Sequence, residues 1–231
     1  GPGKAGMNEE ESLRIIGILR DGIRGHLNQS RGVALWLSMM TGAEILEAEV
    51  PLLSGAARTR AKAASRKLVH GNRRDARDWL AMADGDAVVR RVGQWFAERD
   101  IHEGTREVLI ISAGSTPAPY NLALGYIWRC ACATVMTPNI VGTDPFDFAI
   151  VPEHDYPDRK PNVLVTLGSP NSIMKDELKK QGEALLKEYP ANSSKIWSIL
   201  IGGDDGNYSV SPSWIKKRIG HIMKIAEQED A

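Results

Sequence analysis

Short apolar runs recur along the chain and alternate with longer stretches in which apolar residues return every three or four positions. Several runs are continuous Val, Ile and Leu rather than strictly alternating, which is typical of strands that are covered on both faces of a sheet. The runs predict strands at Leu13–Leu19, Glu44–Val50, Glu107–Ser112, Thr134–Thr137, Phe146–Val151, Asn162–Leu167 and Ile196–Ile201.

The stretches between these runs have the period of amphipathic helices. They predict helices at Asn28–Met40, Ala56–His70, Asp75–Glu98, Pro119–Arg129, Lys175–Glu188 and Ser211–Gln228. Because strands and helices alternate, we predict an α/β fold built on a doubly wound parallel sheet.

The same pattern predicts three parts along the chain. Residues 1–11 are expected to be a tag and a disordered lead: Gly1–Gly6 has the composition of a tag or cleavage scar before Met7, and Asn8–Glu11 is polar. Residues 12–190 are expected to form one Rossmann-like domain. Residues 191–231 hold one predicted strand and one predicted helix, which we interpret as the start of a second, incomplete Rossmann-like unit.

Composition narrows the class of protein. The chain is 42% hydrophobic and 25% charged, as in soluble globular domains, and Lys plus Arg equals Asp plus Glu at 29 each, so net charge gives no expectation of nucleic-acid binding. No apolar run reaches the roughly 20 residues of a membrane-spanning helix. Cys130 and Cys132 are too close for a comfortable disulfide and too few for a zinc site. We therefore expect a cytoplasmic protein with reduced thiols and no bound metal.

Basic residues concentrate between Ala56 and Arg77, where Asp75 is the only acid. The favoured interpretation is a solvated helix face that offsets acids elsewhere. A surface for anionic lipid headgroups or for an acceptor phosphate is the second. Nucleic acid is the least favoured, because no aromatic residues are interleaved with the charges. The basic residues are Arg58, Arg60, Lys62, Arg66, Lys67, Arg73, Arg74 and Arg77.

The densest potential chemistry follows the first predicted strand. A glycine-studded loop leads there into the predicted helix at Asn28, an arrangement that directs backbone N–H groups at a helix N-terminus toward a ligand. His26 is the candidate catalytic residue, a general base, because imidazole titrates near neutral pH; a helix cap or core contact is the alternative. Asn28 equally fits a helix N-cap. The candidate substrate-binding residues here are Arg24, Gly25, Asn28 and Gln29.

Other strand ends supply further candidates, because the carboxyl ends of parallel strands share one edge of the sheet. Small residues after the third predicted strand suit a phosphate or carboxylate, although any tight strand-to-helix turn uses them as well. His154 lies between Glu153 and Asp155, where a surface turn is favoured over an oriented base. The further substrate-binding candidates are Ser112, Gly114, Ser115, His154 and Gly168.

The last predicted strand runs into a Gly-Gly turn before a helix, which lets a diphosphate approach the backbone closely; a plain connection is equally favoured. The candidate nucleotide-binding residues are Gly202, Gly203, Asn207 and Tyr208. The predicted strand-to-helix turns lack the phosphate-loop lysine, the dinucleotide glycine spacing and the Gly-x-Ser-x-Gly elbow of hydrolases.

Several of these segments together resemble the mitochondrial fission ELM (elongated mitochondria) family of plants and bacteria. The matching segments are Asp21–Ser30, Ile111–Gly114, Phe146–Asp155, Asn162–Gly168, Leu200–Gly203 and Asn207–Tyr208. The resemblance covers about Leu13 to the last residue. It implies a GT-B-like architecture, in which two Rossmann-like domains face each other across a cleft. The N-terminal domain then receives the acceptor and the C-terminal domain holds the nucleotide sugar.

A family member is expected to be longer, with several more strand–helix units after Gly203. The usual location of the donor's binding residues is therefore expected to be missing, so that the chain is truncated, is a natural short form, or is completed by a second chain.

Two functions follow from the resemblance. The first is the acceptor-side portion of a GT-B-like glycosyltransferase, which transfers sugar from a nucleotide sugar, as co-substrate rather than cofactor, to a sugar or lipid-linked acceptor. The second is a non-enzymatic adaptor that binds a membrane surface or a partner through the basic segment. A sugar-nucleotide epimerase is weaker, because the dinucleotide fingerprint is missing. Exposed sheet edges modestly favour a homo-oligomer.

Overall fold

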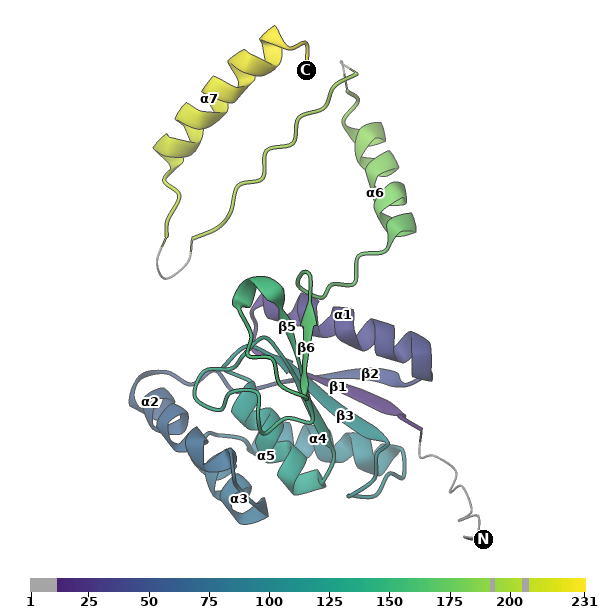
Figure 1. The fold of residues 1–231 in the computed structure, drawn as a ribbon, viewed down its shortest axis with the longest axis vertical. Helices are drawn as coiled ribbons and strands as arrows, with labels where there is room; N and C mark the ends of the chain where they lie inside the picture. Colours follow the sequence, from purple (N-terminus) through teal and green to yellow (C-terminus); the bar gives the residue numbers. More distant parts are fainter. Residues whose placement is uncertain (1–11, 192–193, 205–207) are drawn as a thin grey trace. The chain divides into compact units, whose positions relative to one another are not determined.

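The computed structural model describes residues 12–191, 194–204 and 208–231 of the 231-residue chain (Figure 1). The chain divides into two units, Gly1–Ser172 and Ile173–Ala231, which we call the first and the second unit and describe separately. The helix over Lys175–Glu188 thus belongs with the residues that follow it.

The first unit is built on a six-stranded sheet in which every strand pairs in parallel, in the order β2-β1-β3-β4-β5-β6. The predicted α/β fold with a doubly wound, Rossmann-like sheet is therefore confirmed. The strands are β1 (Ile15–Arg20), β2 (Glu44–Glu49), β3 (Val108–Ala113), β4 (Ala131–Val135), β5 (Phe148–Pro152) and β6 (Val163–Thr166).

Helices cover both faces of this sheet (Figure 1). One face packs against α1 (Arg24–Thr41), and the other packs against the helices that follow β2 and β3. Right-handed crossovers explain this, since the chain turns to opposite sides of β1 when it forms β2 and β3. The other helices are α2 (Gly55–Ala64), α3 (Arg73–Met82), α4 (Asp86–Glu98) and α5 (Ala118–Trp128), with short 3-10 turns η1 (Ser65–Leu68) and η2 (Glu153–Asp155).

The strands of the centre are buried on both faces, as their continuous apolar runs predicted. In β1, Ile15 and Leu19 belong to the core on the α2–α5 side, whereas Ile16 and Ile18 belong to the core under α1. A side chain at Gly17 would collide with the ring of Trp95 on α4, so the glycine makes room for the largest fully buried side chain of the core.

Four predicted elements differ from the structure by more than two residues at one end or are divided. The predicted helix Ala56–His70 ends as an α-helix at Ala64 and is followed by the 3-10 turn η1. The first helix begins at Arg24 rather than Asn28, because Gly22 turns the chain at φ 81° and the Asp21 carboxylate accepts a hydrogen bond from the Ile23 N–H at 3.1 Å. The predicted helix Asp75–Glu98 is two helices, since Asp84 takes a left-handed φ of 54° and the Gly85 N–H donates to the Leu80 carbonyl. The fourth strand runs from Ala131 to Val135, because Met136 is left-handed as well.

The second unit contains two helices, α6 (Lys175–Glu188) and α7 (Pro212–Gln228), both within a residue of the prediction, and its described residues between them are in neither a helix nor a strand. Ser211 caps α7 by accepting a hydrogen bond from the Trp214 N–H at 3.2 Å. None of the described side chains of this unit is buried. The predicted strand Ile196–Ile201 is wrong: these residues are not in a strand, because no described segment of this unit pairs with them.

No helix in the described part of the chain is long and apolar enough to cross a membrane.

Candidate functional site

The most distinctive position in the first unit is the point where the strand order reverses. The chain leaves β1 toward β2 on one side and later enters β3 on the other side, so the loops after β1 and β3 diverge. In sheets of this type ligands bind in the crevice that opens at this switch point, beyond the carboxyl ends of the strands. The loop after β1 carries Asp21 and leads to His26, and the loop after β3 begins at Gly114.

His26 and Asp21 form a hydrogen-bonded pair at this switch point. The Nδ1 atom of His26 lies 2.8 Å from the Asp21 Oδ2 atom, and the other Asp21 oxygen accepts the Ile23 N–H. The Asp21 side chain is 1% exposed, whereas the His26 side chain is 26% exposed. Because an ionised carboxylate only accepts hydrogen bonds, Nδ1 carries the proton and a neutral imidazole has its Nε2 available as an acceptor.

Gly114 holds the other side of the His26 ring. A Cβ atom at this position would lie 2.5 Å from the His26 Cε1 atom, and the residue has a φ of 83°. Glycine is therefore required for two separate reasons, the close approach of the ring and the left-handed backbone. Through this contact His26, which is on the first turn of α1, connects the loops that follow β1 and β3.

A cavity of about 430 Å³ opens at the same edge of the sheet, on the α2–α5 side. Asp21 and Ser115 belong to its lining, so the cavity borders the His26 pair although His26 itself is not among the lining residues. Tyr120 forms part of the floor, where burial, with a smaller contribution from the negative charge of Asp84, raises the pKa of its hydroxyl to about 12. The site therefore combines an oriented histidine with a pocket that can hold a small molecule.

The backbone next to this cavity contains two left-handed residues. Met136 and Ile140, in the segment between β4 and β5, have φ values of 67° and 71°. A left-handed backbone costs about 1 to 2 kcal/mol for a residue other than glycine, and it is least tolerated for a β-branched residue such as Ile140. Since Ile140 also lines the cavity, the strained segment forms one of its walls. Strain of this kind concentrates at functional sites.

Other predicted residues near the switch point have different environments. Ser112 is fully buried, and its hydroxyl accepts a hydrogen bond from the Asn121 amide at 2.9 Å, so it supports the strand end from inside. Ser115 lies at the cavity, where its hydroxyl accepts the Asn139 N–H at 2.8 Å. The N-cap interpretation of Asn28 is wrong, because α1 begins at Arg24 and Asn28 lies inside it.

The remaining α1 candidates lie on its first two turns. Arg24 and Gly25 are exposed, while Gln29 is partly buried with its amide 3.9 Å from the Met136 sulfur. These three residues lie within three positions of His26 along the helix.

The candidates after β5 and β6 lie away from this pair. His154 is 62% exposed in η2 and lies 3.7 Å from the Asp155 carboxylate, an arrangement typical of a surface turn. The Gly168 carbonyl accepts a hydrogen bond from the Thr166 hydroxyl at 2.8 Å, just after β6. At about 4.8 Å per strand, β5 and β6 are roughly 10 Å and 14 Å from β3. The sheet does not bring these residues to His26.

The candidates for nucleotide binding belong to the second unit. Gly202, Gly203 and Tyr208 are exposed and lie in extended chain, and a side chain at either glycine would meet no atom within 4 Å. Asn207 lies outside the described residues.

Sequence reasoning did not identify most of the cavity. Arg58 and Lys62 were recognised only as members of the basic segment, although their spacing of four residues places both on one face of a helix. Trp79 and Tyr120 come from different helices and carry no sequence signal that joins them. The sequence also contains an Asp-x-Asp triplet, Asp84–Asp86, which forms the turn between α3 and α4. Within the described residues, no three His, Cys, Asp or Glu side chains gather as a metal site.

Comparison with known proteins gives one result. The family model described as Mitochondrial fission ELM1 matches residues 24–231, which include α1 of the first unit and all of the second. Searches of curated proteins and of solved structures gave no significant match. The matched range covers most of the chain, including His26 and Gly114. The chain therefore belongs to the mitochondrial fission ELM1 family.

Proposed function

We propose that the first unit is the acceptor-side domain of a GT-B-like glycosyltransferase. The observation that carries this proposal is the Asp21–His26 pair at the switch point of the sheet, beside a cavity of about 430 Å³. The resemblance of the family to two-domain sugar transferases supports the same conclusion. The nucleotide sugar is a co-substrate in this proposal, and the chain contributes the base and the acceptor site.

His26 is the general base in this mechanism. Its Nε2 atom takes the proton of an acceptor hydroxyl while the hydroxyl oxygen bonds to the anomeric carbon, and the bond from that carbon to the nucleoside diphosphate breaks. Asp21 holds the ring through Nδ1 and stabilises the imidazolium that forms. Asn28 and Gln29, which follow His26 on α1, position acceptor hydroxyls. Ser115 binds the anionic part of the substrate. Gly202 and Gly203 are proposed to contact the donor diphosphate.

The test is turnover of a panel of nucleotide sugars by the complete natural protein. We expect His26→Ala to lower kcat at least 100-fold, since a positioned base contributes about 10²- to 10⁴-fold. Asp21→Asn is expected to have a smaller effect in the same direction. His154→Ala is the matched control, because it removes an exposed histidine after β5 and is expected to leave turnover unchanged. Undiminished turnover in His26→Ala would remove His26 from this role.

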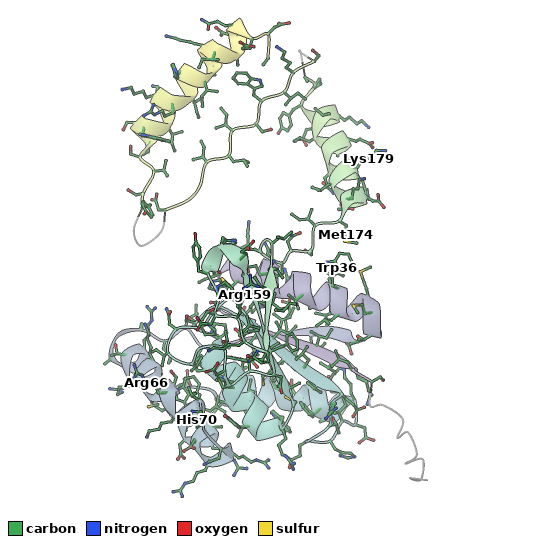
Figure 2. The ribbon with its side chains drawn as sticks, in the orientation of Figure 1. Trp36, Arg66, His70, Arg159, Met174 and Lys179 are labelled. Atoms are coloured by element: carbon green, nitrogen blue, oxygen red, sulfur yellow. The ribbon has the colours of Figure 1, made fainter. Side chains whose placement is uncertain are left out.

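The alternative is an adaptor that binds an anionic membrane surface through the basic segment. In its favour, Arg66 and His70 project outward from η1 and the turn that follows it (Figure 2). Against it, Arg73 is bound to Glu103 at 2.8 Å, and Arg58 and Lys62 line the cavity. Sedimentation with vesicles that contain phosphatidylserine separates the two functions, because Arg60→Glu with Arg66→Glu should abolish binding only in an adaptor. The proposal also includes a cytoplasmic location and a homo-oligomer. Imaging tests the location, and light scattering tests the oligomeric state.

A further inference from the structure

The cavity beside Asp21 has the size of a small-molecule site. Its volume of about 430 Å³ lies within the roughly 300–1,000 Å³ of typical ligand pockets. Its walls come from the turns after β1 and β3, the segment after β2, the helices α2, α3 and α5, the turn η1, and the segment between β4 and β5. Elements that are distant in sequence therefore enclose one volume, and the chemistry of their side chains defines what the cavity can hold.

Two aromatic rings form the floor of the cavity, and their polar atoms are hydrogen-bonded to the backbone rather than available to a ligand. The Trp79 indole N–H donates to the Ala61 carbonyl at 2.9 Å, and the Tyr120 hydroxyl donates to the Ala83 carbonyl at 2.7 Å. Both polar groups are thus engaged inside the protein. The other apolar lining residues, apart from Ile23 and Leu52 at the rim, are Pro51, Leu53, Ala61, Pro119 and Ile140. The two aromatic rings offer no partner for the polar edge of a purine or pyrimidine, whereas an aliphatic group needs none.

The rim of the cavity is apolar on one side. Ile23 is 51% exposed and Leu52 is 70% exposed, and both belong to the lining. An aliphatic chain that extends beyond the floor would continue to contact these side chains. The apolar part of the ligand is therefore not restricted to the enclosed volume.

The polar part of the lining consists of two cations together with Asp21, Ser65, Ser115, Thr116 and Asn139. Arg58 and Lys62 lie one turn apart on α2, and neither forms an ion pair with any of the residues that the structure describes. Arg73, farther along the same basic segment, is by contrast neutralised by Glu103. The carboxylate of the cavity, Asp21, is buried and engaged with His26 and with the Ile23 N–H. The unneutralised charge of the cavity is therefore positive.

We propose that this cavity binds an anionic amphiphile, a phosphate ester of an aliphatic chain. The aliphatic chain of the ligand lies against the aromatic floor and the apolar rim of the cavity, and its phosphate pairs with Arg58 and Lys62. Ser115 can add a hydrogen bond, since its oxygen accepts the Asn139 N–H and its own proton is free to donate. This inference rests on the proposed function, because it names the class of molecule that carries the acceptor hydroxyl: the aliphatic chain and the phosphate lie in the cavity, and the hydroxyl that His26 would deprotonate belongs to a group attached to the phosphate, outside the cavity.

The test uses the 231-residue chain and n-octyl phosphate below its micelle concentration, with binding measured by titration calorimetry. We expect saturable binding at one site, tighter than that of octanol or of inorganic phosphate. In the series from butyl to octyl phosphate, affinity is expected to rise up to about fourfold for each added methylene, since burial of one methylene contributes about 0.8 kcal/mol. Adenosine monophosphate binding more tightly than octyl phosphate, or equal affinity for all chain lengths, would overturn the proposal.

Matched variants locate the site. Arg58→Ala with Lys62→Ala should weaken octyl phosphate binding about tenfold or more and leave octanol binding nearly unchanged. The control removes the same charge from the same segment through Arg60→Ala with Arg66→Ala, which do not line the cavity, and it should change the affinity less than twofold. An equal loss in both pairs would mean that net charge alone attracts the ligand, which contradicts the proposal.

The two proposals fail separately. His26→Ala should keep octyl phosphate binding, because His26 does not line the cavity. If octyl phosphate binds as predicted but no nucleotide sugar is turned over, the ligand class stands and the transferase proposal falls. If turnover depends on His26 while octyl phosphate and phosphate bind equally weakly, the ligand class falls and the transferase proposal stands.

Discussion

The two units of the chain share the same alternation of apolar segments and amphipathic helices, but only the first unit turns this pattern into a core. In the first unit, Ile15, Ile18 and Trp95 are at most 1% exposed. In the second unit, Leu185, Ile196 and Leu200 remain 58–96% exposed. The same apolar residue types are therefore buried in the unit that has a sheet and exposed in the unit whose described residues form none.

This difference separates local from non-local structure. The helices of the second unit form from their own period, with a side-chain cap at α7 only, and α6 has the bounds that the sequence predicts. The apolar segment Ile196–Ile201 does not become a strand, because a strand requires hydrogen bonds from a neighbouring strand. In the first unit, β1 has such neighbours on both sides. A helix can thus be predicted from its own residues, whereas a strand depends on the rest of the sheet.

The largest expected effect compares one tryptophan from each unit. Trp95→Ala removes a side chain that is 1% exposed over β1 and should lower the free energy of unfolding by about 3 to 5 kcal/mol. Trp214→Ala in α7 removes a side chain that is 52% exposed and contacts Arg218, and it should change the same free energy by less than about 0.5 kcal/mol. Urea unfolding followed by far-ultraviolet circular dichroism measures both. Similar losses in the two variants would show that the second unit has a core as well.

The next effect concerns the buried hydroxyl of Tyr120 in the first unit. Burial raises its pKa to about 12, from 10.0, so the folded chain keeps a proton that the unfolded chain loses. The resulting contribution to stability is complete below pH 10 and is lost as the pH rises to 12, by about 2 to 3 kcal/mol. Urea unfolding at pH 8, 10 and 11.5 should show this decline.

Tyr120→Phe is the control for that decline. At pH 8 it should lose about 1 kcal/mol, because the hydrogen bond to the Ala83 carbonyl is gone. Its stability should then fall less steeply with pH than that of the unmodified chain. Parallel curves for the two proteins would assign the decline to other groups.

Prediction from sequence was most successful where the signal was continuous along the chain. The doubly wound sheet, its parallel pairing and the burial of β1 on both faces follow from apolar runs that alternate with helical periods. The start of α1 was placed four residues too late, because the glycines were interpreted as a loop, whereas Asp21 and Gly22 complete the turn by themselves. The break between α3 and α4 depends on Asp84, whose left-handed backbone satisfies the end of α3.

The candidate site was predicted in part for the same reason. His26 was identified from its own chemistry and from its place after a strand. Its partner Asp21 is five residues away on the other side of a turn, a spacing that belongs to no regular element. The cavity was missed because its floor joins Trp79 and Tyr120 from separate helices, and only the packed structure brings them together.

A smaller effect is expected at Gly114, where the first unit depends on the absence of a side chain. Gly114→Ala should cost about 1 kcal/mol for the left-handed backbone and up to about 1 kcal/mol more for displacing the His26 ring. Gly42→Ala is the matched control, since Gly42 has a φ of 76° and open space around it. The double variant with His26→Ala should recover the difference between the two. Equal costs for Gly114→Ala and Gly42→Ala would contradict the close contact with His26.

The smallest effect compares the helix caps of the two units. Asn72 accepts hydrogen bonds from the Arg74 and Asp75 N–H groups at the start of α3, so Asn72→Ala should lower the global free energy of unfolding by about 1 kcal/mol. Ser211→Ala removes the corresponding bond from α7 and should leave the global value unchanged, because no described side chain of that unit is buried. Its loss should be confined to faster amide exchange in the first turn of α7. A global loss from Ser211→Ala as large as that from Asn72→Ala would mean that both units unfold as one cooperative body.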